Sequence, residues 1–456
     1  MPAKIQIMIM SFMLMKRTVY DDLLAWKNNE SRKPLLLEGV RQCGKTYILK
    51  KFGKREYDDV AYFMLQNNPK IHRIFRTDSD PRRMIDELGV ARKKKIEPKK
   101  TLIILDEIQS CGEALTSLKF FCDDAPEYHI ACAGSLLGVM MAVPHSFPVG
   151  KVDRINMYPM SFKEFLLANS EDLLVEYIEK NVPMNGDMPF IETLNTYLDY
   201  YFLTGGMPEA VASWVGEKDI RKVDSVLDRI IRDYETDFSK HAPELLAKMT
   251  MIWHSIPVQL AKDNKKFVFG HVKTGARSKD LEDALEWLVN AGLVHKVRRV
   301  NRPEVPLSMF ADNTDFKVYL ADVGVLRRMS GAPSNIMFSR DKEYATYRGV
   351  AAENFVLNEL ITSNGDVPYY WRSDGISEVD FVAQMGGSAI PIEVKAGSTK
   401  SKSIGEFIKR YGSEIAVITS PRKDKREVVT YVPLPLIWML RNHILMKIPK
   451  SVPKII

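Results

Sequence analysis

The chain has 456 residues, of which 45% are hydrophobic and 27% are charged. This length predicts two to four domains rather than one core, and the composition excludes a disordered or membrane-embedded chain. The formal net charge of +7 permits a polyanionic partner without requiring one. The four cysteines form neither a C-x-x-C pair nor a zinc-ligand pattern, so we expect reduced thiols.

Residues 5–15 form an apolar, methionine-rich stretch, which Lys16 and Arg17 follow. The stretch is too short to span a bilayer, and it lacks the charge order and the cleavage site of a signal peptide. We therefore expect translation to begin at Met13 or Met15, with residues 1–14 a leader outside the fold. No other segment approaches the length of a membrane-spanning helix, so we expect a cytoplasmic protein without a membrane partner.

Apolar strand-like runs alternate with helical patterns from about residue 33 to 165. The runs lie at residues 35–37, 60–65, 102–105 and 130–133. Continuous apolar runs of this length are typical of buried parallel strands, and their alternation with helices predicts a doubly wound α/β sheet.

The first of these strands leads into a glycine-rich turn that is typical of phosphate binding. The turn has the form G-x-x-x-x-G-K-T and consists of Gly39, Val40, Arg41, Gln42, Cys43, Gly44, Lys45 and Thr46. Its glycines let backbone N–H groups surround a phosphate, and the helix that begins there adds its dipole. Lys45 is expected to contact the β- and γ-phosphates, and Thr46 to ligate Mg²⁺. The turn therefore predicts a site for ATP and Mg²⁺.

The strand at residues 101–105 ends in two acidic residues, Asp106 and Glu107. After a complete phosphate-binding turn, Asp106 is expected to hold Mg²⁺ and Glu107 to activate the attacking water. The next strand ends at Ser135, a candidate sensor of the γ-phosphate, with an ordinary helix cap as the equal alternative. Arg154 is a candidate transition-state arginine that nothing in the sequence distinguishes from a surface arginine.

The middle of the chain is predicted to be mostly helical, with helical patterns from about residue 161 to 240. Residues 245–330 then combine a helix, a short strand and a basic loop that contains Arg298, Arg299 and Arg302. This order predicts a winged-helix-like region, and its arginines are placed to contact the phosphates of a nucleic acid.

Residues 378–395 predict a β-hairpin with two glycines at its turn. In the register that this turn sets, Asp380 lies opposite Glu393 and Glu378 lies opposite Lys395. A shift of one residue would move these side chains to other faces, so the expected pairing depends on that register.

Two carboxylates that face each other across a hairpin destabilise it unless something offsets their charge. A divalent metal held by Asp380 and Glu393 would do so, with Glu353 on the preceding helix as a further ligand. Lys395 would then help to generate the nucleophile, while the metal activates water and a scissile phosphate. In the alternative, Lys395 pairs with Glu378 and the hairpin holds no metal.

Several motifs together resemble a family of bacterial and archaeal AAA+ ATPases that carry a C-terminal domain of unknown function. They lie at residues 35–46, 102–109, 133–138, 158–162, 205–209, 237–243 and 319–324. The resemblance implies that Lys45, Thr46, Asp106 and Glu107 serve the nucleotide. It also implies a C-terminal domain related to PD-(D/E)XK nucleases, whose signature Asp380, Glu393 and Lys395 match. The chain departs from relatives at residues 64–66, which are less acidic here.

The implied fold is an α/β P-loop NTPase of the AAA+ type, with a helical lid, a winged-helix-like region and a C-terminal α/β nuclease-like domain. We expect a leader at 1–14, the ATPase core at 15–165, the lid at 166–244, the winged-helix-like region at 245–330 and the nuclease-like domain at 340–456.

Two functions follow from these expectations. In the first, ATP binding and hydrolysis serve an enzyme that acts on DNA, with a Mg²⁺-dependent nuclease-like domain whose cutting activity is open. In the second, the chain is a nucleotide-operated regulatory switch that binds DNA or a protein partner without cleavage. A small-molecule kinase is disfavoured because the additional domains are typical of recognition modules. The oligomeric state is a separate question, and a homo-oligomer is possible.

Overall fold

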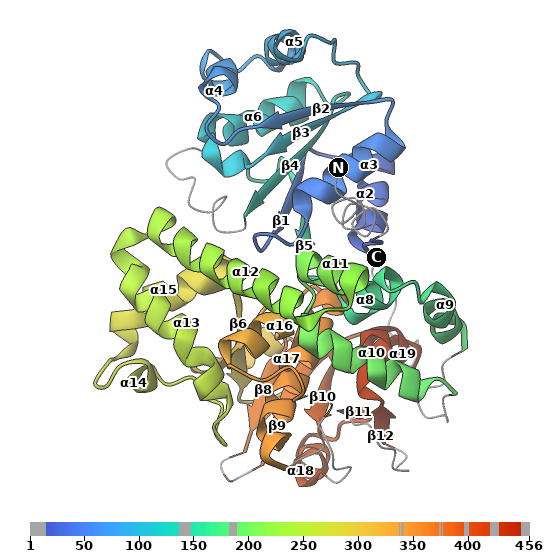
Figure 1. Ribbon diagram of the computed structural model, residues 1–456, viewed down its shortest axis with the longest axis vertical. Coiled ribbons are helices and arrows are strands. Elements are labelled where there is room, and N and C mark those ends of the chain that lie inside the picture. Colours follow the sequence, from blue (N-terminus) through green and yellow to red (C-terminus); the bar gives the residue numbers. More distant parts are fainter. Residues whose placement is uncertain are drawn as a thin grey trace. The chain divides into compact units, whose positions relative to one another are not determined.

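The computed structural model describes residues 15–135, 147–181, 189–336, 338, 342–373, 375, 377–395, 401–419 and 428–447. The chain divides into two compact units, whose elements are labelled in Figure 1. The first unit comprises Lys16–Tyr158 and Asn290–Leu293. The second comprises the described residues of Pro159–Val289 and those from Val294 onward. The expected leader at 1–14 lies outside the described residues.

The first unit is built on a five-stranded parallel sheet (Figure 1). Its strands are β1 (Leu35–Gly39), β2 (Asp59–Met64), β3 (Thr101–Asp106), β4 (His129–Ser135) and β5 (Asp153–Met157). They lie in the order β2-β3-β4-β1-β5, so that β4 separates the strand before the glycine-rich turn from the strand that ends at Asp106. Strands β1 and β3 are buried along their whole length, which explains their unbroken apolar sequences. This is the α/β sheet of a P-loop NTPase, as the sequence predicts.

Helices cover both faces of this sheet. They are α2 (Val19–Asn28), α3 (Lys45–Glu56), α4 (Pro69–Arg76), α5 (Pro81–Arg92) and α6 (Gly112–Asp124), with the short helix η1 (Ile108–Ser110) after β3. Helix α3 packs so closely on one face that a Cβ on Gly53 would lie 2.7 Å from a methyl of Val60. Helices α4, α5 and α6 share a core with Ile103 and Leu105, which alternate with Leu102 along β3 and so lie on the other face.

The second unit begins with helices, in the region where the sequence predicts them. They are α8 (Phe162–Ala168), α9 (Asp172–Asn181), α10 (Ile191–Thr204), α11 (Pro208–Glu217), α12 (Ile220–His241), η2 (Pro243–Leu245), α13 (Leu246–Leu260), α14 (Phe269–Val272) and α15 (Ser278–Asn290). A capping box formed by Ser161 and Glu164 starts α8. The turn between α10 and α11 needs glycine, because a Cβ on Gly206 would lie 2.1 Å from the carbonyl oxygen of Met160.

A seven-stranded mixed sheet follows in the second unit, in the order β12-β11-β10-β9-β8-β6-β7 (Figure 1). Its strands are β6 (Val294–Val300), β7 (Ala311–Leu320), β8 (Tyr369–Arg372), β9 (Glu378–Met385), β10 (Ser388–Val394), β11 (Ala416–Thr419) and β12 (Val429–Val432). The remaining helices are η3 (Leu307–Phe310), α16 (Val323–Met329), η4 (Lys342–Tyr344), α17 (Ala345–Asn364), α18 (Lys402–Tyr411), η5 (Leu434–Met439) and α19 (Leu440–Lys447). Strand β6 pairs with β7 on one side and with β8 on the other, so segments 245–330 and 340–456 contribute to one sheet.

Among the helices of the described residues, none combines the length and the apolar character that crossing a membrane requires.

Candidate functional site

The glycine-rich turn connects β1 to α3 through backbone conformations that favour glycine. Gly44 caps the N-terminus of α3 with a φ of 98°, and Gln42 also has a positive φ, of 64°. A Cβ on Gly39 would lie 2.1 Å from the carbonyl oxygen of Met157 on β5, so only glycine fits there. The turn therefore has the close approach and the positive φ angles that an anion-binding loop needs.

The ammonium group of Lys45 lies against its own loop. Its Nζ donates hydrogen bonds to the carbonyl oxygens of Gly39 at 2.8 Å and Val40 at 2.9 Å. Arg17, which lies close to the expected leader in the sequence, also binds this loop. Its guanidinium donates to the carbonyl oxygens of Cys43 at 2.9 Å and Tyr158 at 2.6 Å.

Asp106 is buried at the carboxyl end of β3, and both of its carboxylate oxygens accept hydrogen bonds. The hydroxyl of Thr46 donates to Oδ1 at 3.0 Å, and the hydroxyl of Tyr62 on β2 donates to Oδ2 at 2.9 Å. Burial, followed by this hydrogen bond to Asp106, raises the pKa of Tyr62. The Nζ of Lys50 lies 3.3 Å from the centre of the Tyr62 ring, so α3 contacts Asp106 through Tyr62 as well as through Thr46.

Glu107 follows in the left-handed conformation, with φ 54° and ψ 50°. Such a conformation costs a non-glycine residue energy and is concentrated at functional sites. The side-chain amide of Gln109 donates to Oε2 of Glu107 at 2.5 Å. No pattern in the sequence indicated that Tyr62 or Gln109 contacts the two acidic residues.

Ser135 and Arg154 are the other two candidates of the first unit. Ser135 ends β4 in register with Gly39 of the glycine-rich turn. Arg154 forms two hydrogen bonds with the buried carboxylate of Glu38, at 2.7 and 2.8 Å. This side-chain hydrogen bonding raises the pKa of Arg154. The guanidinium is thus committed to a pair within the sheet.

The C-terminal hairpin forms with the expected turn and register. Gly386 and Gly387 have φ angles of 55° and 83°, as a two-residue primed turn requires. The pairing of β9 with β10 runs to Ile392 opposite Phe381, which continues toward Glu393 opposite Asp380. An oxygen of the Asp380 carboxylate accepts a hydrogen bond of 2.8 Å from the backbone N–H of Val394.

Lysines contact the other carboxylates around this hairpin. Lys265, in the loop after α13, pairs with Glu353 on α17, and Lys317 on β7 pairs with Glu378. Lys395 pairs with Glu393 at 2.6 Å, so the alternative pairing of Lys395 with Glu378 is not formed. The sequence analysis included neither Lys265 nor Lys317.

Electrostatics in this group raise the pKa values of Asp380, Lys317 and Lys395. Burial, followed by the charge of Glu353, raises the pKa of Asp380. Burial alone would lower the pKa of Lys317 and Lys395, but the surrounding carboxylates outweigh it and raise both values. Within the described residues, no group of three histidine, cysteine, aspartate or glutamate side chains is placed to hold a metal ion. The predicted ligands Glu353, Asp380 and Glu393 therefore do not fit a metal as they stand.

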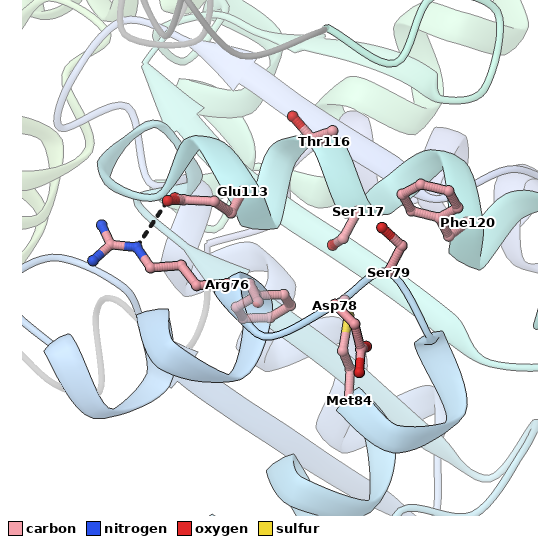
Figure 2. A pocket seen from close by; sticks show the side chains of 9 residues that line it. Arg76, Asp78, Ser79, Met84, Glu113, Thr116, Ser117 and Phe120 are labelled. Carbon is pink, nitrogen blue, oxygen red and sulfur yellow. Dashed lines mark hydrogen bonds and ion pairs between the residues drawn. The ribbon is translucent and has the colours of Figure 1, made fainter.

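A pocket with a volume of about 270 Å³ lies in the first unit, between α4, α5 and α6. Figure 2 shows the side chains that line it. Arg76 and Glu113 point toward each other there and form an ion pair of 2.8 Å. Phe75, Met84 and Phe120 supply its apolar lining. None of these residues is a candidate from the sequence.

Comparisons with known proteins match three parts of the chain. Residues 31–166 match a family described as an AAA domain. Residues 195–335 and 348–437 match two domains of unknown function, DUF8612 and DUF4143. Uncharacterized proteins of Mycobacterium bovis and Mycobacterium tuberculosis are each 32% identical over 88 residues, which is 19% of this chain and 19% of theirs.

Solved structures share the arrangement only distantly. A Walker-type ATPase of Pyrococcus abyssi is 14% identical with a TM-score of 0.44, over 69% of this chain and 95% of its own. DnaA of Aquifex aeolicus with bound AMPPCP is 15% identical with a TM-score of 0.28, over 60% of this chain and 88% of its own. Similarities this distant give no information on function. The match of residues 31–166 to the AAA domain supports an AAA+ ATPase family, whereas the C-terminal match is to a domain of unknown function.

Proposed function

We propose that this protein binds ATP with Mg²⁺ and hydrolyses it at the glycine-rich turn. The observation that carries the proposal is the 3.0 Å contact between Thr46 Oγ1 and Asp106 Oδ1. Mg²⁺ takes oxygen ligands and is bound in nucleotide sites by few protein groups together with phosphates. A hydroxyl from α3 and a carboxylate from β3, brought together beside the loop, are such a donor set.

Residues 39–46 would hold the phosphates. The positive φ angles of Gln42 and Gly44 and the N-terminus of α3 favour an anion at this loop. The ammonium of Lys45 contacts uncharged acceptors of the loop, two carbonyl oxygens and the sulfur of Cys43, which phosphate oxygens can replace as stronger, charged acceptors. Ser135 lies at the adjacent strand end and is proposed to contact the γ-phosphate.

Glu107 is the proposed general base, because it directly follows the Mg²⁺-binding Asp106 at the end of β3. Its hydrogen bond with Gln109 gives its carboxylate a defined direction. Bound Mg²⁺ would neutralise phosphate charge, while Glu107 orients the attacking water and accepts its proton.

Two variants test this proposal, with ATP binding and steady-state hydrolysis as separate readouts. Lys45→Ala is expected to weaken ATP binding about 100-fold, since charge-assisted hydrogen bonds to phosphate are lost. Glu107→Gln is expected to bind ATP like the wild type and to hydrolyse it at least about 100-fold more slowly. Lys54→Ala is the matched control for Lys45→Ala, because Lys54 lies at an exposed position on α3, the helix that begins at Lys45. Wild-type turnover in both site variants would contradict the proposal.

The use that the chain makes of ATP has two candidates, DNA cleavage and switching without cleavage. The contacts of Glu353 and Glu393 with lysines favour the switch, because a catalytic metal would have to displace those ammonium groups. Arg299 in β6 was expected to contact the phosphates of DNA, as in a winged helix, but its guanidinium pairs with Asp315 instead. This pair weighs against such a contact. We therefore propose that the ATPase acts as a switch whose partner is DNA or protein.

Incubation of linear and circular DNA with Mg²⁺ or Mn²⁺, with and without ATP, separates the two candidates. We expect no cutting. Cutting by the wild type that disappears in Asp380→Ala would establish a metal-dependent nuclease and would contradict the switch.

A further inference from the structure

Seven charged side chains gather around the C-terminal hairpin, and we call them the charged cluster. They are Glu353, Glu378, Asp380, Glu393, Lys265, Lys317 and Lys395. The four carboxylates come from α17, β9 and β10, and two of the lysines come from residues 245–330. The cluster therefore spans both segments of the shared sheet.

Burial makes the pairing of these charges a strict requirement. Glu353 is 5% exposed, Glu393 is 3% exposed and Lys317 is 1% exposed. An isolated charge at such a position costs several kcal/mol of desolvation, so it is tolerated only with a counter-charge and hydrogen bonds. Lys317 is paired with Glu378, and the pKa of Lys317 is raised although burial opposes it.

The three predicted metal ligands have almost no free oxygen atoms. Glu353 accepts from Lys265 at Oε1 and from the hydroxyl of Tyr319, 3.1 Å away, at Oε2. Glu393 contacts Lys395 at Oε1 and accepts from the hydroxyl of Ser401 at Oε2.

Asp380 accepts from the N–H of Val394 at Oδ2. Protein donors thus contact five of the six carboxylate oxygens of these residues, namely both oxygens of Glu353, both of Glu393 and one of Asp380. A metal ion at these oxygens would have to displace the donors, two of them ammonium groups, that already contact them.

We infer that Lys265 and Lys317 are built-in counter-ions that take the role of a divalent cation. The charged cluster is then a structural network of ion pairs, which we call the electrostatic lock, and not a metal-dependent catalytic centre. The lock joins the loop after α13 and strand β7 to α17 and the hairpin. Ammonium groups fixed by the fold neutralise the carboxylates without any ligand from solution. This inference is independent of ATP hydrolysis, which uses none of these residues.

A double-mutant cycle between Lys265 and Glu353 tests the lock, with thermal unfolding as the readout. Lys265→Met leaves Glu353 buried without its counter-ion, and Glu353→Gln leaves Lys265 without its partner. We expect each to lower Tm by about 5 °C. The double variant is expected to regain more than half of the summed loss, because neither charge is then unpaired. Lys262→Met, at an exposed position in the same loop, is the control and should leave Tm unchanged.

Additive losses in the double variant would overturn the inference, because they would show that the pair is not coupled. A second measurement does not depend on the stability of the variants. Calorimetric titration of nucleotide-free protein with Mn²⁺ should give the same isotherm for the wild type and for Asp380→Asn. A Mn²⁺ site that is present in the wild type and absent from Asp380→Asn would also overturn it.

Discussion

Asp106 in the first unit and Glu353 in the second are both buried carboxylates, at 2% and 5% exposure, but they differ in their partners. Asp106 accepts hydrogen bonds from neutral groups, namely two hydroxyls and a backbone N–H. Glu353 accepts from an ammonium group and a hydroxyl. Neutral donors leave the negative charge of Asp106 to be balanced by a cation from solution, whereas the chain itself balances Glu353. We therefore propose that carboxylates of similar burial serve a metal site in one unit and a structural contact in the other.

The largest effect is expected when Asp106, the proposed Mg²⁺ ligand of the first unit, loses its charge. Asp106→Asn keeps the shape of the side chain but weakens Mg²⁺ binding, and we expect kcat for ATP to fall about 100-fold. Asp123→Asn on α6, which alters an exposed ion pair with Lys151, should leave kcat unchanged. Steady-state assays at saturating Mg²⁺ measure both, and full activity of Asp106→Asn would remove the distinction drawn between the two carboxylates.

A smaller effect is expected at Tyr62, which we propose positions Asp106. Tyr62→Phe removes a hydrogen bond to a charged group, so we expect about fivefold more Mg²⁺ for half-maximal ATPase rate. The rate at saturating Mg²⁺ should change little. Tyr57→Phe is the matched control, because its hydroxyl contacts His129 instead. An unchanged Mg²⁺ dependence in Tyr62→Phe would restrict Tyr62 to packing.

The smallest effect concerns a third buried carboxyl, Glu359, whose pKa no cation among the described residues lowers. Its Oε1 accepts a hydrogen bond of 2.8 Å from the N–H of Phe162, and burial raises its pKa to about 8 from the ordinary value of 4.5. The folded chain thus holds a proton that the unfolded chain releases, so the stability from this group is complete below about pH 4.5 and is lost as pH rises through about 8.

Glu359→Gln cannot ionise and keeps the acceptor for Phe162. We expect its Tm relative to the wild type to rise by a few degrees between pH 6 and pH 9, measured by thermal unfolding in matched buffers. A Tm difference that stays constant over this range would show that Glu359 does not titrate in the folded chain.

Local patterns predicted the first unit well, because its chemistry lies at strand ends and in one turn. The unbroken apolar runs predicted four of the five parallel strands, and the glycines, Lys45 and Thr46 predicted where the loop meets α3. The hairpin register also followed from the two glycines alone, since a two-residue turn determines which residues lie opposite each other.

The partners of the C-terminal carboxylates could not be predicted in the same way. Lys265 lies 88 residues before Glu353, and Lys317 lies 61 residues before Glu378. Only the pairing of β6 with both β7 and β8 brings these segments into one sheet, and no local periodicity encodes that contact. Tyr62 and Arg17 were missed for the same reason, because each reaches its partner across the fold.

The most direct measurement counts the Mn²⁺ ions bound per chain, by equilibrium dialysis with a non-hydrolysable ATP analogue. We expect a single tightly bound Mn²⁺ that is lost in Asp106→Asn and kept in Asp380→Asn. A Mn²⁺ ion that remains in Asp106→Asn, or one that disappears in Asp380→Asn, would show that the two units do not differ in the way their contacts indicate.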